Sequence, residues 1–401
     1  MKKVCYNNFM IKIDDLGMNG EGIAHKNGKA IFLPFYLPEE EIEDNKIVKT
    51  SPHRTTPKCK YFKTCGGCNL QHLAYEQSLI FKRNKIQNLL KKFKLDFVVS
   101  NCIASENTYA YRNKLTLKCI NGILGLYKTN SNDIVEIQSC QIVSKEINNS
   151  IKIIKEHSLK NINEIILHSQ ENEILISFYL NNNNIDNIQK ISKKMQIIFK
   201  KYGILAYFNK NLIFSSGVKQ LTKTDFGITY PFTNDAFYQV NDGVKNKLYS
   251  HVLKLIDKND RVVDAYSGCG LMSAILSKKC KSVTGIEIVK EATKNANALK
   301  ESNSIKNLIN LNGDCAKILP TLFDYNKLVL DPPRAGLDKK VITTILNCKP
   351  KHILYISCNP ATLARDVQLL GKNYKIISIT PYDMFPQTAH VEALCLLELN
   401  I

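Results

Sequence analysis

The alternation of hydrophobic and polar positions predicts a small β-module at the start of the chain. Residues 9–14, 23–25 and 29–33 read as short strands, separated by glycine-rich turns at residues 16–22 and 27–28. These strands predict a compact β-barrel over residues 1–52, of a size that suits binding rather than catalysis. Residues 52–57 contain two prolines and are expected to form a linker.

The middle of the chain, residues 53–237, carries mixed patterns that predict a central α+β domain. A basic amphipathic pattern predicts a helix over residues 75–94, and the segment up to about residue 100 is expected to pack on the domain that follows. Strand-like runs occupy residues 114–119, 164–168 and 174–179, and asparagine-rich segments such as residues 181–184 separate them.

From about residue 241 the pattern becomes a regular alternation of apolar strands and helices. This alternation is typical of a parallel, doubly wound sheet, so residues 238–401 are predicted to form a Rossmann-like domain. The expected fold class is a multidomain α/β protein. No stretch approaches the roughly 18 apolar residues of a membrane span, and the amino terminus lacks the apolar core of a signal peptide. A cytoplasmic protein without membrane contact is therefore expected.

Charge and cysteine content narrow the class of partner and of chemistry. The net charge of +19 indicates a polyanionic partner, with nucleic acid the first candidate, although an AT-rich, lysine-biased genome would also raise the charge. Only six of the 55 basic residues are arginines, and Arg112, Arg334 and Arg365 lie in motif-like runs. In a reducing compartment, grouping among the 13 cysteines indicates metal binding or catalysis rather than disulfides.

Cys358 follows a short apolar strand at residues 352–357 and precedes an Asn-Pro turn signal. Its side chain is therefore expected at the carboxyl end of a strand, the edge where open α/β sheets bind ligands. The alternative is a buried structural cysteine, which is the commoner fate of a single thiol.

A second strand end carries the pattern of a methyl-donor site. The strand at residues 261–265 runs into a turn with Gly268 and Gly270 and then into a helix predicted at residues 271–279, and Glu287 ends the next strand. The glycines allow close backbone approach, and the acid can accept hydrogen bonds from ribose hydroxyls. The form Asp-x-x-x-Gly-x-Gly fits S-adenosylmethionine better than a nicotinamide cofactor. Asp314 stands where an adenine-contacting acid is usual, although a plain turn would look the same.

Two further acids adjoin apolar strands, and Asp331 is predicted to reach the same sheet edge as Glu287 and Cys358. Asp331 ends a buried-type strand, and the two prolines after it fix a rigid exit; Asp-Pro-Pro in this position is typical of nucleic-acid methyltransferases, or of a simple strand-ending turn. Glu392 opens the last strand, residues 393–399, where desolvation would raise its pKa toward that of a working base. An ordinary edge residue is the alternative.

The combination of a thiol, a carboxylate base, a methyl-donor pocket and a basic surface indicates one reaction. C5 of a pyrimidine is a poor nucleophile, but attack of a thiolate at C6 makes C5 enolate-like and able to take a methyl group. A base must then remove the C5 proton so that the cysteine is eliminated.

At residues 357–366 and 385–392 the chain resembles the two catalytic signatures of the RNA uracil-C5 methyltransferases, and the likeness covers essentially the whole chain. The resemblance implies that Cys358 is the nucleophile and Glu392 the base. The run at residues 237–241 implies that Gln239 contacts the cofactor or the target base. Tyr266, Glu287 and Asp331 match methyl-donor positions, although Tyr266-Ser267 replaces a Phe-Cys pair of other members, and Leu271 stands where some relatives have a polar residue.

The amino-terminal module resembles the TRAM domain of this family, a small RNA-binding barrel. Cys59, Cys65 and Cys68, together with Cys140, resemble the four ligands of a [4Fe-4S] cluster in the ribosomal RNA branch. Spacing alone also permits zinc, so the preference for iron–sulfur, and the inclusion of Cys140, come from the resemblance.

The resulting prediction is S-adenosylmethionine-dependent methylation of C5 of one or more uridines in 23S ribosomal RNA. The target base is expected to be flipped out or already in a loop, and the protein is expected to act as a monomer. The same reaction on a T-loop uridine of transfer RNA is the first alternative. A non-catalytic RNA-binding ribosome assembly factor is the second, although such a role would require neither Cys358 nor Glu392.

Overall fold

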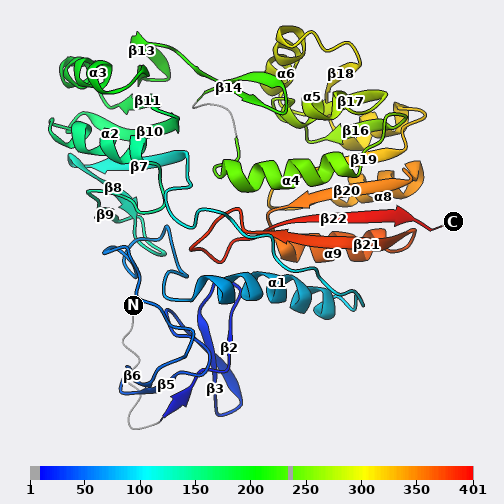
Figure 1. Cartoon of the computed structure of the whole chain (residues 1–401), viewed down its shortest axis with the longest axis horizontal. Helices are drawn as coiled ribbons and strands as arrows, with labels where there is room; N and C mark the ends of the chain where they lie inside the picture. Colours follow the sequence, from blue (N-terminus) through cyan, green and yellow to red (C-terminus); the bar gives the residue numbers. More distant parts are fainter. Residues whose placement is uncertain (1–9, 234–237, 401) are drawn as a thin grey trace.

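The structure is a computed structural model that describes residues 10–233 and 238–400, so Phe9 and Phe237, which belong to predicted patterns, lie outside the described residues. Figure 1 shows a small β-module at the base of the view, a sheet with helices at the left and a second sheet with helices at the right. Within the described ranges, every helix is too short or too polar to span a lipid bilayer.

The N-terminal module contains two three-stranded antiparallel sheets, in the orders β1-β5-β6 and β2-β3-β4. Its strands are β1 (Ile11–Lys12), β2 (Asp15–Leu16), β3 (Gly22–Lys26), β4 (Lys29–Leu33), β5 (Glu41–Glu43) and β6 (Lys46–Lys49). Asn27 and Gly28 both have positive φ (50° and 71°), the backbone that a tight hairpin turn requires. The predicted strands at residues 23–25 and 29–33 are therefore confirmed as one hairpin, β3–β4.

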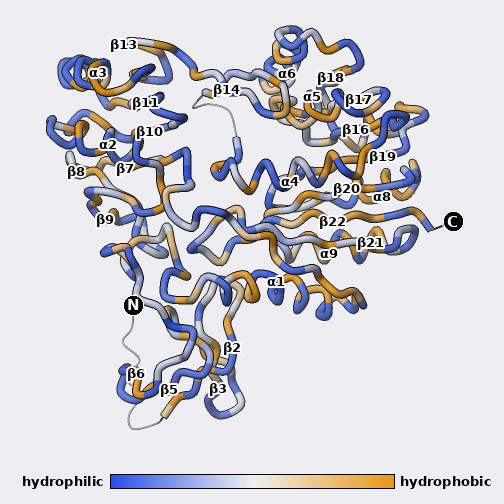
Figure 2. The backbone as a smooth tube through the Cα atoms, viewed as in Figure 1, coloured by the Kyte–Doolittle hydropathy of each residue, from blue (hydrophilic) through white to orange (hydrophobic). Residues whose placement is uncertain are grey.

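Helix α1 (Tyr75–Lys92) connects the module to the rest of the molecule and lies beside α9 (Pro360–Leu370) and β21 (Tyr374–Tyr382). The helix ends two residues before the predicted end, and Lys94 just beyond it has a left-handed φ of 57°. Figure 2 shows hydrophobic and hydrophilic residues alternating along α1. Its buried residues Ile86, Leu89 and Leu90 join the core of the C-terminal sheet.

The central part is a seven-stranded sheet in the order β13-β12-β11-β10-β7-β8-β9, antiparallel except between β11 and β12. Its strands are β7 (Lys114–Ile120), β8 (Ile123–Tyr127), β9 (Ile134–Glu136), β10 (Ile162–Gln170), β11 (Glu173–Leu180), β12 (Lys201–Phe208) and β13 (Asn211–Gly217). Helices α2 (Lys145–Lys155) and α3 (Asp186–Ile198) share one apolar core with the sheet. The three predicted strands lie within β7, β10 and β11 and are confirmed.

A hairpin and a helix lead into the C-terminal part: β14 (Leu221–Asp225), β15 (Ile228–Phe232) and α4 (Asp242–Lys254). The sheet that follows has seven strands in the order β18-β17-β16-β19-β20-β22-β21. They are β16 (Arg261–Ala265), β17 (Ser282–Glu287), β18 (Leu308–Asn312), β19 (Lys327–Leu330), β20 (His352–Ser357), β21 and β22 (Glu392–Leu399). The helices are α5 (Leu271–Ser277), α6 (Lys290–Ser302), α7 (Cys315–Ile318), the 3₁₀ helix η1 (Leu319–Thr321), α8 (Lys339–Cys348) and α9.

This sheet is mixed and not wholly parallel. Strands β16 to β20 run parallel, whereas β22 is antiparallel to both β20 and β21. The prediction of a parallel sheet is thus wrong at this edge, because β21 and β22 are joined by the short loop 383–391, and a parallel partner would need a longer crossover. The chain reverses its strand order between β16 and β19, the position at which open α/β sheets bind ligands.

Candidate active site and cysteine pocket

The turn after β16 is shaped for close approach of a ligand to the backbone. Gly268 and Gly270 have φ of 53° and 80°, and Gly270 is the N-cap of α5. A Cβ atom at Gly270 would lie 2.7 Å from the Cβ of Ala296, so only glycine lets α5 pack this closely on α6. Tyr266 also has a positive φ (66°), which is rare for a bulky residue and concentrates at functional sites.

Glu287 is tied to this turn. Its Oε2 accepts a hydrogen bond from the Gly268 N–H (2.9 Å) and its Oε1 accepts one from the Val289 N–H (2.8 Å). The backbone oxygen of Glu287 accepts a hydrogen bond from Gly313 N (2.9 Å). This bond brings the following residue, the predicted adenine-contacting acid, close to Glu287. That acid, Asp314, caps α7 by accepting from Ala316 N (2.9 Å). The structure thus brings Glu287 and Asp314 to one edge, and also gives Asp314 the ordinary capping role of a turn residue.

Gln239 lies on the segment that precedes α4 and is buried. Its backbone oxygen accepts a hydrogen bond from Asn113 Nδ2 (3.4 Å), and the Asn113 N–H donates to Val240 O (3.0 Å). Asn241 is the N-cap of α4 and donates from its Nδ2 to Ser105 Oγ (3.0 Å). The Gln239 segment is therefore fixed against residues of the central part.

Cys358 and Glu392 flank the last pair of the β20–β22 ladder. Ser357, the last residue of β20, pairs with Ala393 of β22, so Cys358 directly follows this pair and Glu392 directly precedes it. The charge of Glu392 acts on the Cys358 thiol. Two residues separated by 34 positions thus become neighbours at the sheet edge.

The two acids of this cluster are desolvated. Burial raises the pKa of Glu392 to about 8, with a further contribution from the charge of Asp331, whereas the charge of Arg334 opposes the shift. Burial alone raises the pKa of Asp331 to about 7. The pKa of the Cys358 thiol is raised by burial and by the charge of Glu392, and Arg334 again lowers it. These side chains interact electrostatically, as a nucleophile and a base in one site would.

The sequence singled out Arg334 only as a rare arginine, yet its charge acts on both Cys358 and Glu392. The loop that carries Arg334, residues 331–338, is held in place by residues that follow Cys358 in the chain. Asn359 Nδ2 donates to the backbone oxygen of Arg334 (2.9 Å), and Arg365 Nη2 donates to the carbonyls of residues 335 and 337 (3.0 Å each). Arg365 is thus a support for the loop that carries Arg334.

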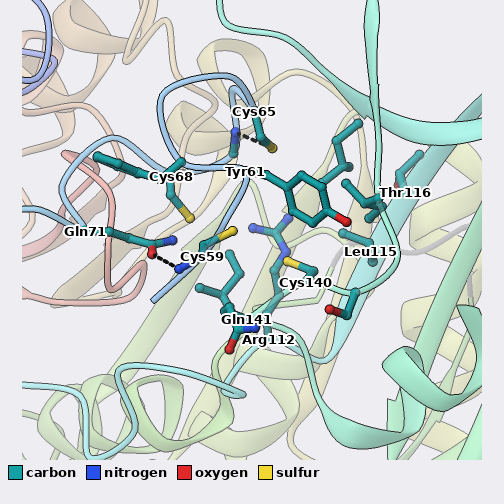
Figure 3. A pocket seen from close by; sticks show the side chains of 16 residues that line it. Cys59, Tyr61, Cys65, Cys68, Gln71, Arg112, Leu115, Thr116, Cys140 and Gln141 are labelled. Atoms are coloured by element: carbon teal, nitrogen blue, oxygen red, sulfur yellow. Dashed lines mark hydrogen bonds between the residues drawn. The ribbon is translucent and has the colours of Figure 1, made fainter. Parts of the chain in front are cut away.

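Cys59, Cys65, Cys68 and Cys140 line a single cavity of about 190 Å³ (Figure 3). Leu115 and other apolar side chains complete its wall. Burial raises the pKa of Cys68 to about 12, and the charges of the other three cysteines add to the shift. A buried thiol such as that of Cys68 becomes a stable thiolate when a cation binds beside it.

Within residues 10–233 and 238–400, no group of three or more His, Cys, Asp or Glu side chains is arranged to hold a metal ion. Four cysteine sulfur atoms are a donor set that suits either a zinc ion or an Fe–S cluster, and here the four line one cavity. Cys140 is fixed by Asn148, which accepts from Cys140 N (2.8 Å) and donates to Cys140 O (3.0 Å).

Comparison with known proteins identifies relatives over almost the whole chain. Residues 74–400 match the family described as tRNA (Uracil-5-)-methyltransferase. An uncharacterized RNA methyltransferase of Listeria innocua is 32% identical, with 97% of each chain covered. One of Fusobacterium nucleatum is 31% identical over 98% of this chain and 96% of its own.

Among solved structures, the tRNA (uracil-54, C5)-methyltransferase of Pyrococcus abyssi in complex with S-adenosyl-L-homocysteine has the same fold. Its TM-score is 0.80 at 24% identity, and 97% of this chain and 100% of that chain are covered. The likeness therefore extends to the arrangement of all three parts rather than to the C-terminal sheet alone.

Proposed function

This chain belongs to the RNA uracil-C5 methyltransferase family, and from that premise we propose that it methylates C5 of a uridine through a covalent bond from Cys358 to C6. The observation that carries this proposal is the end of the β20–β22 ladder, where Cys358 and Glu392 flank the last pair and the charge of the buried Asp331 acts on both side chains. A non-catalytic assembly factor would need neither side chain, and the family consists of enzymes.

In the proposed reaction the Cys358 thiol loses its proton to water, and the thiolate forms a bond to C6 of the uracil. The electron pair released toward C5 takes the methyl group from S-adenosylmethionine, which leaves as S-adenosylhomocysteine. The Glu392 carboxylate then accepts the C5 proton, the C6–sulfur bond breaks, and the thiolate of Cys358 is restored. Arg334, whose charge lowers the pKa of Cys358, favours the thiolate.

The methyl donor is expected in the crevice beside the glycine turn. Glu287 is oriented by two backbone N–H groups and would accept hydrogen bonds from the ribose. Asp314 would contact the adenine. Tyr266 and Asp331, which directly follow β16 and β19, would contact the remaining part of the donor or the target base, and Gln239 is assigned the same role on the resemblance.

The four cysteines of the pocket would hold a [4Fe-4S] cluster, as their shared cavity supports. Such a cluster would join the segment before α1 to the segment between β9 and α2 and need not take part in bond formation. Absence of both a brown chromophore and iron in anaerobically prepared protein would favour zinc, or a site that holds no metal.

The N-terminal module would act as a TRAM domain that, together with α1, binds RNA phosphates with salt-sensitive affinity. We propose 23S ribosomal RNA as the substrate of a monomeric enzyme, on the resemblance of the module and the cysteines to the ribosomal branch. The similarity to the Pyrococcus abyssi enzyme supports the alternative substrate, transfer RNA. Mass mapping of methylated uridines in RNA from cells that lack this protein distinguishes the two substrates.

The chemistry can be tested with RNA that contains 5-fluorouridine. Without a C5 proton the adduct cannot be resolved, so wild-type protein with methyl donor should give a covalent protein–RNA band on a denaturing gel. The band should be absent for Cys358→Ala and present for Glu392→Gln, since the base acts only after methyl transfer. A missing wild-type band, or a band that survives Cys358→Ala, would exclude the mechanism.

A further inference from the structure

The loop 383–391, which joins β21 to β22 and ends immediately before Glu392, is held by segments that lie far from it in the sequence. Helix α1, the segment after Cys68 and Tyr111 each form hydrogen bonds with this loop. Figure 1 shows the loop between β21 and β22 reaching from the C-terminal sheet toward the central part. The position of the proposed base therefore depends on residues outside the C-terminal sheet.

The first anchor is a buried ion pair. Lys82 of α1 forms a salt bridge with Asp383, and both side chains are fully buried (0% exposed). Lys82 Nζ also donates to Phe385 O (3.1 Å), and the Tyr75 hydroxyl donates to the other carboxylate oxygen of Asp383 (2.8 Å). The hydroxyl in turn accepts from Ser105 N (2.8 Å). Because both charges are desolvated, loss of either partner leaves the other without compensation.

The second anchor is the segment that follows Cys68. Asn69 N and Leu70 N both donate to Gln387 O (3.2 and 3.0 Å). Gln387 has a left-handed φ of 69°, and in this conformation its carbonyl faces both donors. The Asn69 side chain accepts from Ala389 N (2.8 Å) through Oδ1 and donates to Asn19 O (2.5 Å) of the N-terminal module through Nδ2. One amide thus joins three parts of the protein.

Two further bonds complete the attachment, from Lys85 Nζ to Ala389 O (2.8 Å) and from the Tyr111 hydroxyl to Pro386 O (3.1 Å). Cys358 is supported differently. It precedes α9, whose N-cap Asn359 bonds within the C-terminal part, to Ala361 N and Arg334 O. Cys358 and Glu392 border the same sheet, but the hydrogen bonds to the loop 383–391 act on the chain segment that leads directly into Glu392.

We infer that Asn69, Lys82 and Asp383 are positioning residues for Glu392, which control the elimination step and not the attack of Cys358. The inference rests on the proposed function. It assigns the segment after Cys68 and α1 a role in catalysis through the geometry of the base, in addition to any contact with RNA. A displacement of about 1 Å at a catalytic group can cost on the order of 10²-fold in rate.

The test separates attack by Cys358 from the elimination that requires Glu392. Trapping on 5-fluorouridine RNA reports attack and methyl transfer, whereas turnover on ordinary RNA also requires removal of the C5 proton. For Asn69→Ala and Lys82→Met, we expect a trapping rate close to that of wild type and turnover reduced on the order of 10²-fold. A methylated covalent complex with ordinary RNA should accumulate on a denaturing gel.

Two comparison variants distinguish positioning from general destabilisation. Asn69→Asp keeps the acceptor for Ala389 N but loses the donor to Asn19 O, so it should recover part of the turnover lost in Asn69→Ala. Lys327→Met removes another buried ion pair, to Asp260 (2.8 Å), at the amino end of β19, and should leave the ratio of trapping to turnover unchanged.

Three outcomes would overturn the inference. Trapping and turnover could fall together in the Asn69→Ala and Lys82→Met variants, or neither rate could fall in them. Alternatively, Lys327→Met could also lose turnover while it keeps trapping. If Lys82→Met does not fold, Asn69→Ala still decides, because its side chain is not part of the buried ion pair. Failure of wild-type protein to trap 5-fluorouridine RNA would instead refute the proposed function itself.

Discussion

Glu287 Oε2 accepts a hydrogen bond of 2.9 Å from the backbone N–H of Gly268, 19 residues earlier in the chain. A second bond, from Val289 N to Oε1 (2.8 Å), fixes the other carboxylate oxygen. The carboxylate is therefore oriented before any ligand arrives, and each oxygen retains a lone pair for a further donor. This arrangement links the shape of the glycine turn to the expected ribose contact.

Glu287→Ala should weaken binding of S-adenosylhomocysteine strongly, because both the ribose contacts and the support of the turn are lost. A hydrogen bond to a charged group contributes about 1.5–3 kcal/mol, so a loss on the order of 10²-fold in affinity is expected by calorimetry. Glu291→Ala, which removes only an exposed ion pair with Lys294, is the matched control and should bind normally. Equal affinity in the two variants would contradict the ribose assignment.

The rate of turnover should depend on pH through Glu392. The base acts as a carboxylate, and burial raises its pKa to about 8, so breakdown of the covalent complex should accelerate as pH rises toward 8 and level off above it. Trapping on 5-fluorouridine RNA depends on the Cys358 thiolate, whose pKa is raised above its usual value of 9, and should keep rising beyond that pH. Stopped reactions from pH 6 to 10 measure both profiles. Identical profiles would argue against Glu392 as the base.

Glu392 should also reduce the stability of the free protein above its unfolded pKa. Its folded pKa of about 8 exceeds the usual 4.5, so between these values the folded state holds a proton that the unfolded state has released, and stability falls as pH rises. Glu392→Gln should therefore unfold at a higher temperature than wild type at pH 8, with little difference at pH 4.5. Calorimetric scans at the two values test this, and a gain that is equal at both would be inconsistent with the linkage.

The sequence predicted the positions of the candidate site residues better than the supports that hold them. Cys358 and Glu392 lie where strand-end patterns placed them, because strands β20 and β22 have clear apolar runs bounded by turn or loop residues. The antiparallel direction of β22 was not predicted, since an apolar run has no direction. Its consequence, that Cys358 and Glu392 flank the same ladder pair, was therefore visible only in the structure.

The anchor between Lys82 and Asp383 joins residues 301 positions apart, and no local pattern relates them. One signal was available, because Lys82 lies on the apolar face of α1 together with Ser78, Ile86 and Leu90, at a spacing of four residues. A lysine within a buried helical stripe predicts a buried partner without naming it. Cys140 is a similar case, since a distant cysteine can be joined to the others only by the fold or by a resemblance.

Asp366 supports the loop that carries Arg334, and its loss should impair attack by Cys358. Its Oδ2 accepts from the Tyr355 hydroxyl (2.7 Å) and from Leu337 N (2.8 Å), all three being buried. Asp366→Ala leaves these donors unpaired, at a cost of about 1–3 kcal/mol each in stability, and releases the loop. We expect slower trapping on 5-fluorouridine RNA, whereas the Asn69→Ala variant should trap at a rate close to that of wild type. Unchanged trapping in a folded Asp366→Ala protein would remove Arg334 from the proposed mechanism.

The N-terminal module is joined to the segment before α1 by a two-point ion pair, from Arg54 Nε to Glu40 Oε1 (2.5 Å) and from Arg54 Nη2 to Glu40 Oε2 (2.8 Å). Glu40 is completely buried, so Arg54→Leu would leave the Glu40 carboxylate without a partner. Breaking a buried ion pair of this kind lowers the free energy of unfolding by about 3–5 kcal/mol. The module should then detach locally, and limited proteolysis near residues 50–58 should accelerate.

If the module binds RNA, Arg54→Leu should raise the KM for RNA and flatten its salt dependence, while kcat at saturating RNA changes little. Lys49→Leu breaks an exposed pair with Glu41 in the same module, which contributes at most about 1 kcal/mol, and serves as the matched control for docking. A fall in kcat with unchanged KM would show that the module acts on the chemical step. That result would point to the Asn19–Asn69 bond, and not to RNA phosphates, as the route by which the module influences Glu392.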